Sequence, residues 1–243
     1  MQHAREIQGN GLRGSARRAL LGPGIMALVM LAILLALGTW QVRRLHWKEG
    51  ILARIAAAEA APPTRLTAHP GPFAKVFARG EFRGGRIALY GVAVHDTPQG
   101  PLIGADQIVP LREADGTLVL VDRGWVPTAP GAPPTPVPDG PATVEGYVRA
   151  PERPTWFGVG DDLVRRQFFT LDPGKIGAAL GIAHVAPFVL VAMGSVAPGI
   201  YPIPATHFPE PPNNHLQYAI TWYGLAIALV VIFVEWSRKR LNA

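Results

Sequence analysis

Two long apolar stretches of this 243-residue chain, each without a charged side chain and each long enough for a membrane helix, constrain its fold more than any other feature. The first covers residues 19–42 and the second residues 211–234, with its apolar part beginning at Leu216. About 20 apolar residues in a helix cross the hydrocarbon core of a bilayer. Buried helices of soluble proteins rarely reach this length without a charge. We therefore predict transmembrane helices at residues 19–42 and 213–236.

The first stretch has one alternative interpretation, a cleaved signal peptide. Ala36-Leu37-Gly38 has the small residues that flank a cleavage site. The apolar region is longer than the roughly 7–15 residues typical of signal peptides, so we expect an uncleaved anchor.

Basic residues beside the second span predict the orientation of both helices. Arg238, Lys239 and Arg240 follow it directly, and no basic residue lies between Tyr201 and His215. Because Lys and Arg accumulate on the cytoplasmic side, both termini are expected there. No long Arg- and Ser-rich stretch precedes the first span, which favours a bacterial inner membrane over a mitochondrial one.

The multi-pass arrangement divides the chain into five expected segments. They are a cytoplasmic segment 1–18, the helix 19–42, a periplasmic domain 43–212, the helix 213–236 and a basic cytoplasmic tail 237–243.

The charge and the cysteine content exclude several classes of protein. The net charge is +6, but the basic residues flank the apolar stretches, which indicates a lipid bilayer rather than a nucleic acid as the partner. The absence of cysteine excludes disulfides, cysteine-ligated metals, cysteine nucleophiles and covalently attached c-type haem.

The region between the spans shows short apolar runs separated by turn residues, which is typical of strands. The runs lie at residues 75–82, 87–94, 102–111, 117–121, 143–148, 167–171 and 188–193. A continuation helix over 48–61 stops at Pro62, and a short helix over 175–180 is capped by Asp172 and Pro173. We predict a membrane protein whose two transmembrane helices anchor an α+β soluble domain, built on an antiparallel sheet that curls or closes into a small barrel.

Two turn sequences predict hairpins within that sheet. The first is Arg83-Gly84-Gly85-Arg86 and the second contains Asp115-Gly116.

Enzyme motifs are missing from the domain. Ser195 lacks the spacing of a nucleophile elbow, no HExxH occurs, and the histidines of the domain are isolated in sequence. We expect a protein that is not an enzyme. A deep pocket lined by carboxyl groups with shifted pKa values would be the observation that favours an enzyme instead.

The exit of the first span places three large polar or aromatic side chains on one helical face. Trp40, Arg44 and Trp47 are spaced at i, i+4 and i+7. The arrangement suits either an interfacial aromatic belt or a cation held between two indoles and aimed at an anionic group.

The entry of the second span presents His215 at its mouth, with Ala219, Trp222 and Ala226 continuing the same face. A flat ligand or a partner helix could lie on this face. A histidine here is either interfacial or a ligand, and neutral imidazole is the usual axial ligand of haem iron.

At these residues the chain resembles the surfeit locus protein 1 family of cytochrome oxidase assembly factors. The similar segments are GTWQVRRLHWK (38–48), VLVDRGWVP (119–127, with Asp122 where the family more often has Asn), EGYVR (145–149), FFTLDPGKIGAALG (168–181) and NNHLQYAITWYGLA (213–226).

The resemblance implies a haem a chaperone that holds haem for the catalytic subunit I of a haem–copper oxidase. His215 would be the axial ligand, with Tyr218 and Trp222 packing near the macrocycle. Arg44, fixed by Trp40 and Trp47, would pair with a propionate. Residues of the central motif would contact subunit I or a haem a synthase, namely Arg123, Gly124 and Trp125.

Two alternatives stay open. One is a purely structural assembly factor that binds subunit I without a cofactor, and the other is a membrane-anchored periplasmic enzyme.

Overall fold

The computed structural model describes residues 2–98, 100–132, 135–156 and 158–242, with side chains from residue 20 onward. The chain divides into two compact units. The helical unit contains the chain up to Ala53 and from Glu210 onward, and the barrel unit covers Arg54–Pro209.

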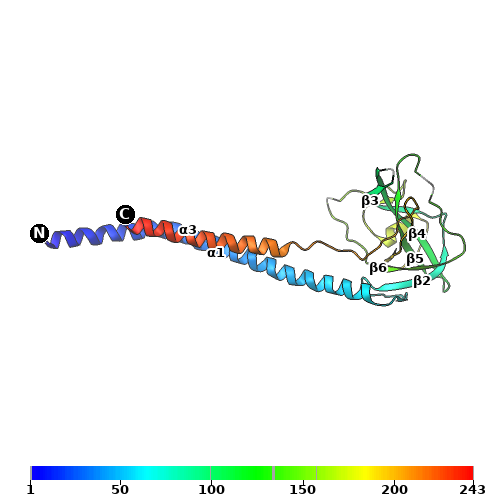
Figure 1. Ribbon diagram of the computed structural model, residues 1–243, viewed down its shortest axis with the longest axis horizontal. Coiled ribbons are helices and arrows are strands. Elements are labelled where there is room, and N and C mark those ends of the chain that lie inside the picture. The colour runs from blue at the N-terminus through cyan, green and yellow to red at the C-terminus, as the bar shows by residue number, and fades with distance from the viewer. Residues whose placement is uncertain (1, 99, 133–134, 157, 243) are drawn as a thin grey trace. The chain divides into compact units, whose positions relative to one another are not determined.

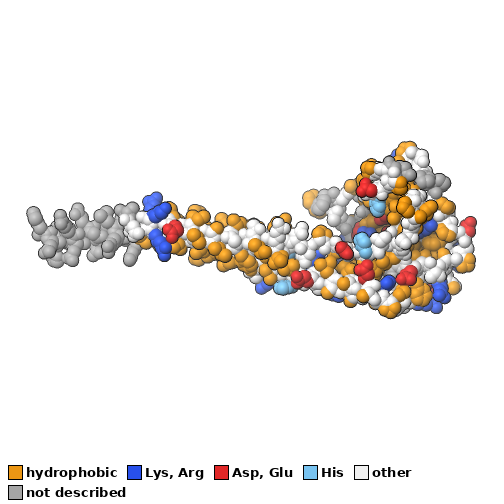
Figure 2. Space-filling view, viewed as in Figure 1, with side chains coloured by type: hydrophobic (Ala, Val, Ile, Leu, Met, Phe, Trp, Pro, Cys, Tyr) orange, Lys and Arg blue, Asp and Glu red, His pale blue; other side chains and the backbone are white. Residues whose placement is uncertain are grey.

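Two long helices form the helical unit (Figure 1). Helix α1 covers Gln2–Ala60 and helix α3 covers His215–Asn242. Over Leu20–Ala60 and over α3, length and hydropathy are sufficient to cross a membrane. Figure 2 shows hydrophobic side chains along the visible face of this pair and charged ones gathered towards its ends, as expected for apolar helices with polar flanks.

The two helices lie side by side and run antiparallel. Gly38 lies against Tyr223, where an added Cβ would come within 2.7 Å of the ring, and Gly24 lies nearest Phe233. The hydroxyls of Thr39 and Tyr223 are 3.2 Å apart. Small residues at such contacts let helix backbones approach closely. The Ala219 and Ala226 face of α3 is therefore buried by a partner helix, one of the two occupants that its sequence allowed.

Five strands of the barrel unit close on themselves. They are β2 (Lys75–Phe82), β4 (Gly100–Glu113), β5 (Leu118–Pro127), β6 (Pro141–Arg149) and β8 (Val189–Ala192). They follow the order β2-β6-β8-β5-β4, and pairing of β4 with β2 closes the ring. All neighbours in the ring are antiparallel except β5 and β8. The predicted sheet and its closure into a barrel are confirmed.

Three further strands extend the sheet beyond the barrel. Strand β1 (Thr64–Arg65) pairs with β2, and β3 (Ala88–Thr97) and β7 (Gln167–Phe168) continue outward from β4. The register of β3 against β4 shifts between Tyr90 and Ala93, which marks a bulge. At this bulge the Gln167 amide donates to the Gly91 carbonyl at 2.6 Å, and the Trp125 indole donates to the Ala93 carbonyl at 3.1 Å.

One of the two predicted hairpins is wrong. The Asp115-Gly116 turn joins β4 to β5, and Gly116 has the positive φ of 90° that such a turn requires. Arg83–Arg86 also turns, but β2 pairs with β1, β4 and β6, whereas β3 pairs with β4 and β7. The Arg83 amide donates instead to the Pro110 carbonyl of β4, because β4 must approach β2 to close the barrel.

The barrel core consists of two clusters of buried apolar side chains. One lies between β2, β4, β5, β6 and β8, and the other lies beneath α2 (Pro173–Ala179). The Asp172 carboxylate caps α2 by accepting from the Lys175 amide, as predicted. The last turn of α1 is joined to this unit, since the Glu59 carboxylate accepts from the Phe208 amide at 3.2 Å.

Replacing Leu190 of β8 should test how far the domain depends on its core. Leu190 is fully buried, so Leu190→Ala should reduce the free energy of unfolding by about 2–5 kcal/mol. Chemical unfolding of the full-length protein in detergent measures this. Val94→Ala, at an exposed position of β3, is the control and should change it by less than about 0.5 kcal/mol.

Candidate functional site

The first site is built around His215, the first residue of α3. Its ring nitrogen Nδ1 lies 2.8 Å from Oε1 of Gln41 in α1. Gln41 is only 8% exposed, which is unusual for an amide within an apolar helix. The hydrogen bond joins residues that are 174 positions apart in the chain and ties the two helices together at the N-terminal end of α3.

A second polar group of this site is Asn213, two residues before α3. Its carbonyl oxygen Oδ1 is buried and has no hydrogen-bond partner among the described residues. An unsatisfied buried acceptor is costly, by about 1–3 kcal/mol, and calls for an explanation. This oxygen, two residues before His215 in the sequence, is the kind of group that a bound molecule with a donor would satisfy.

The cation of the site is Arg44. Its guanidinium lies over the Trp47 ring, 3.8 Å from the ring centroid. Within the described residues Arg44 forms no hydrogen bond or ion pair, so its donors are available to an anion. Trp40 is 56% exposed, and the structure shows the Arg44 stack with Trp47 and none with Trp40.

Of the predicted residues, His215 contacts Gln41 and Arg44 contacts Trp47. Arg44 follows Gln41 at i+3 on α1, a spacing that makes side chains neighbours on a helix. Among the residues that the structure describes, no hydrogen bond joins Arg44 to His215 directly. Tyr218 is exposed on α3 and Trp222 is partly buried.

Sequence reasoning missed Gln41 and Asn213. The signal for Gln41 was its position, because an amide inside an apolar helix needs a polar partner on a neighbouring helix. Nothing local marked Asn213, since its burial depends on the fold.

The central motif on β5 occupies a different kind of position. Trp125 is 2% exposed and stacks on the His95 ring with centroids 4.7 Å apart. Gly124 is also buried, has a φ of 110°, and faces the Ile203 carbonyl where a Cβ would collide. The Arg123 guanidinium is half-buried and donates to Gln107 at 2.6 Å. Contact of this motif with a partner stays a prediction, and the structure places Gly124 and Trp125 within the barrel wall.

Two carboxylates lie together in that wall. Asp122 is 3% exposed and accepts from the Gly124 amide at 2.9 Å. Burial, followed by the nearby Asp106 carboxylate, raises the pKa of Asp122 well above its usual range. The pKa of Asp106 is also raised, chiefly by burial.

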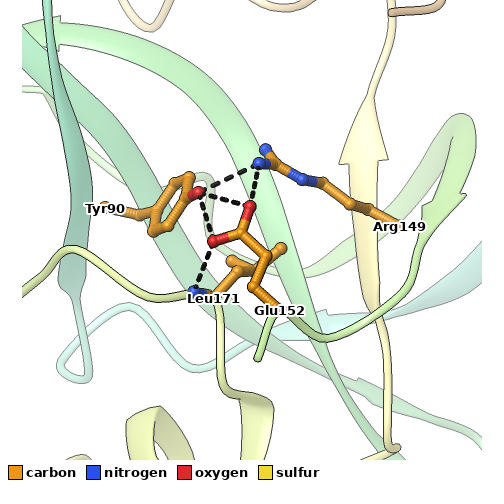
Figure 3. Close-up of polar contacts among 4 residues, drawn as sticks. All are labelled: Tyr90, Arg149, Glu152 and Leu171. Atoms are coloured by element: carbon orange, nitrogen blue, oxygen red, sulfur yellow. Dashed lines mark hydrogen bonds and ion pairs between the residues drawn. The ribbon is translucent and has the colours of Figure 1, made fainter. Parts of the chain in front are cut away.

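A second polar cluster fastens three segments of the domain (Figure 3). The Arg149 guanidinium donates to Glu152 at 2.7 Å and to the Tyr90 hydroxyl at 2.9 Å. The Tyr90 hydroxyl and the Leu171 amide also donate to Glu152, at 2.9 and 3.1 Å. Burial raises the pKa of Tyr90 to about 12, so its hydroxyl stays a donor. Each member is satisfied by the others, which indicates a structural rather than a catalytic role.

Asp106 and Asp122 are not among the residues that line a cavity of about 480 Å³ in this domain. That cavity is lined by residues of β2, β4 and the start of β6, including Arg79 and Arg112, together with Glu113, whose pKa burial raises. Over the described ranges no three His, Cys, Asp or Glu side chains gather in a way that could hold a metal ion.

Comparison with known proteins agrees with the architecture. The sequence model of the SURF1 family matches residues 28–227. A SURF1-like protein of Rickettsia felis is 28% identical over 225 residues, covering 90% of this chain and 98% of the relative. Human surfeit locus protein 1 is 30% identical over 227 residues, covering 85% of this chain and 73% of the relative. The chain belongs to the SURF1 family.

The buried Asp122 predicts a pH-dependent stability. A carboxyl whose pKa is raised by folding favours the native state in its protonated form, so stability falls as pH rises from the unfolded pKa towards the folded one. Asp122→Asn keeps an acceptor for the Gly124 amide and removes this loss, by up to about 1.4 kcal/mol for each pH unit.

The measurement is chemical unfolding of both proteins at pH 5 and pH 8, where the Asn variant should gain at pH 8 relative to pH 5. Asp96→Asn, at an exposed aspartate of β3, is the control. A stability difference between Asp122→Asn and the wild type that is the same at both pH values would contradict the raised pKa.

Proposed function

We propose that this protein is a haem a chaperone and assembly factor for a haem–copper cytochrome oxidase, holding haem for insertion into subunit I. Membership of the SURF1 family supports a role in cytochrome oxidase assembly, the process in which that family acts. The observation that carries the haem proposal is the hydrogen bond of His215 to Gln41, with Arg44 one turn further along α1 and free of hydrogen bonds and ion pairs to the described residues.

The side chains of this site fit a haem. One neutral imidazole suffices as an axial ligand of haem iron, and His215 is held by one ring nitrogen only. The planar guanidinium of Arg44 suits a carboxylate such as a propionate. The exposed rings of Trp40, Trp47 and Tyr218 offer apolar surface to a flat macrocycle, and Trp222 is partly buried on α3. When bound, the iron supplies a coordination bond and the protein carries out no redox step.

Each residue then has a separate task in a carrier. His215 binds the metal, Arg44 orients one edge of the macrocycle, and Trp47 holds the guanidinium in place. A carrier must release its cargo, and a single axial ligand with one charged contact suits an affinity that permits transfer. A haem a synthase would be the donor and subunit I the acceptor. Arg123 is the member of the central motif that is only half-buried.

The same proposal includes the location. The helices α1 and α3 would span a bacterial inner membrane, with the barrel unit in the periplasm and both termini in the cytoplasm. Support comes from Arg238, Lys239 and Arg240 in the last turns of α3.

Reporter fusions test this orientation. A reporter that is active only in the periplasm should be active when fused after Pro136 and silent when fused after Ala243. An active fusion at the C-terminus would overturn the orientation inferred from the basic residues.

Two substitutions test the haem site. His215→Ala should remove most bound haem from protein purified from cells that make haem a, because the axial bond is lost while the helices stay inserted. Arg44→Lys should lower haem occupancy several-fold, because an ammonium lacks the planar fork and the flat face that stacks on Trp47. Absorbance of haem per protein, at matched expression, measures both.

Arg43→Lys is the matched control, since Arg43 points about 100° away on the same helix and should keep full occupancy. Wild-type protein without haem absorbance would leave the purely structural assembly factor as the better explanation. Wild-type occupancy in His215→Ala would show that another residue ligates the iron.

A further inference from the structure

The hydrogen bond between His215 and Gln41 determines which ring nitrogen carries the proton. The amide oxygen Oε1 can only accept, so Nδ1 of His215 must donate across the 2.8 Å separation. A neutral imidazole carries a single N–H, and its other nitrogen then has a free lone pair. With Nδ1 protonated, the lone pair is at Nε2, for which the described residues supply no partner.

The position of Gln41 is fixed by the packing of the helices around it. Gln41 is buried and lies one turn beyond Gly38, which has no side chain to keep α3 away. The Thr39 hydroxyl bonds to Tyr223 in the same turn. The amide is therefore held in one place, and a group held in this way can orient the ring that it bonds.

We propose that Gln41 is a positioning residue that holds His215 in the Nδ1-protonated form and presents Nε2 to the iron of a bound haem. The inference rests on the proposed function and assigns Gln41 a task within that site. Histidines that ligate metals commonly donate their second ring N–H to a carbonyl or carboxylate, which fixes the ring and makes the ligating nitrogen more basic.

The charge and polarity around the pair favour this task over a simple link between helices. If the hydrogen bond served only to hold the helices together, any pair of polar side chains could form it, and either ring nitrogen of the histidine could be the bonded atom. Here the bonded atom is Nδ1, the orphaned Asn213 oxygen lies two residues away in sequence, and the unpartnered Arg44 follows one turn along α1. Loss of such a supporting group typically costs 10–100-fold in metal affinity.

Three variants separate the two roles. Gln41→Leu removes the acceptor with little change in volume, Gln41→Glu keeps an acceptor at the same reach, and Gln217→Leu changes an exposed glutamine of α3 as the control. The haem-free proteins are examined by ¹⁵N NMR of labelled histidine, which distinguishes the two protonated forms. Haem affinity is then measured by titration with haem b as the probe.

We expect the wild type, Gln41→Glu and Gln217→Leu to show His215 protonated at Nδ1. Gln41→Leu should show a mixture of the two forms and bind haem about 10–100-fold more weakly. Gln41→Glu should bind within a few-fold of the wild type and give a lower reduction potential of the bound haem, because a carboxylate makes the ligand more basic.

A separate measurement checks that the helices still pair in each variant. The chain has no cysteine, so Met30→Cys with Leu229→Cys, from one apolar hollow between α1 and α3, gives a unique crosslink. Equal crosslinking in all variants keeps the affinity comparison valid. If Gln41→Leu loses the crosslink, Gln41→Asn replaces it, since the shorter amide cannot reach His215 yet stays polar.

The outcomes are distinct. A wild type that binds no haem overturns the proposed function and this inference together. Haem binding by the wild type with unchanged protonation or affinity in Gln41→Leu and Gln41→Asn overturns the role of Gln41 alone. Equal losses of haem affinity in Gln41→Leu and Gln41→Glu would reject the action of Gln41 through the ring, because the carboxylate keeps the acceptor for Nδ1–H.

Discussion

The close approach of α1 to α3 at Gly38 is the contact on which the candidate haem site depends. A side chain here would meet the Tyr223 ring, so the helices would move apart. The hydrogen bond from His215 to Gln41 spans only 2.8 Å and could not survive such a separation. Apolar helices in lipid have no hydrophobic drive to associate, and close packing with a few interhelical hydrogen bonds replaces it. Gly38 and the hydrogen bond between His215 and Gln41 thus both contribute to the association of α1 with α3.

The barrel shows a different use of polar groups. Arg149, Glu152 and Tyr90 satisfy one another and fasten β3 and β6 to the segment before α2. Asp122 is buried in the wall with a raised pKa, although its bond to the Gly124 amide needs only a neutral acceptor. The resemblance to a family that more often has Asn here agrees with that reading. The barrel is a scaffold held together by internal polar contacts, and the candidate ligand residues His215 and Arg44 lie in the helical unit.

Much of the fold was predictable because its signals are local. The strand at residues 75–82 matches β2, the Asp115-Gly116 turn joins the expected strands, and Pro62 follows the end of α1 closely. The pairing of β2 with β4 and β6 was not predictable, because ring closure is a long-range contact that periodicity does not encode. For the same reason the sequence indicated His215 but not its hydrogen-bond partner Gln41, which comes from the other helix.

The bulge in β3 has a consequence for the solubility of the domain. Beyond its two pairs with β7, β3 is an outer strand, and Val92 and Val94 on it are exposed. A bare edge of this kind recruits strands from other molecules and seeds aggregates. The Gln167 and Trp125 side chains donate hydrogen bonds to the carbonyls of Gly91 and Ala93. The bulge also breaks the regular spacing of backbone groups that an incoming strand would need for pairing. The Gln167 side chain and the bulge thus protect this edge from pairing with another molecule, so loss of Gln167 would favour self-association of the domain.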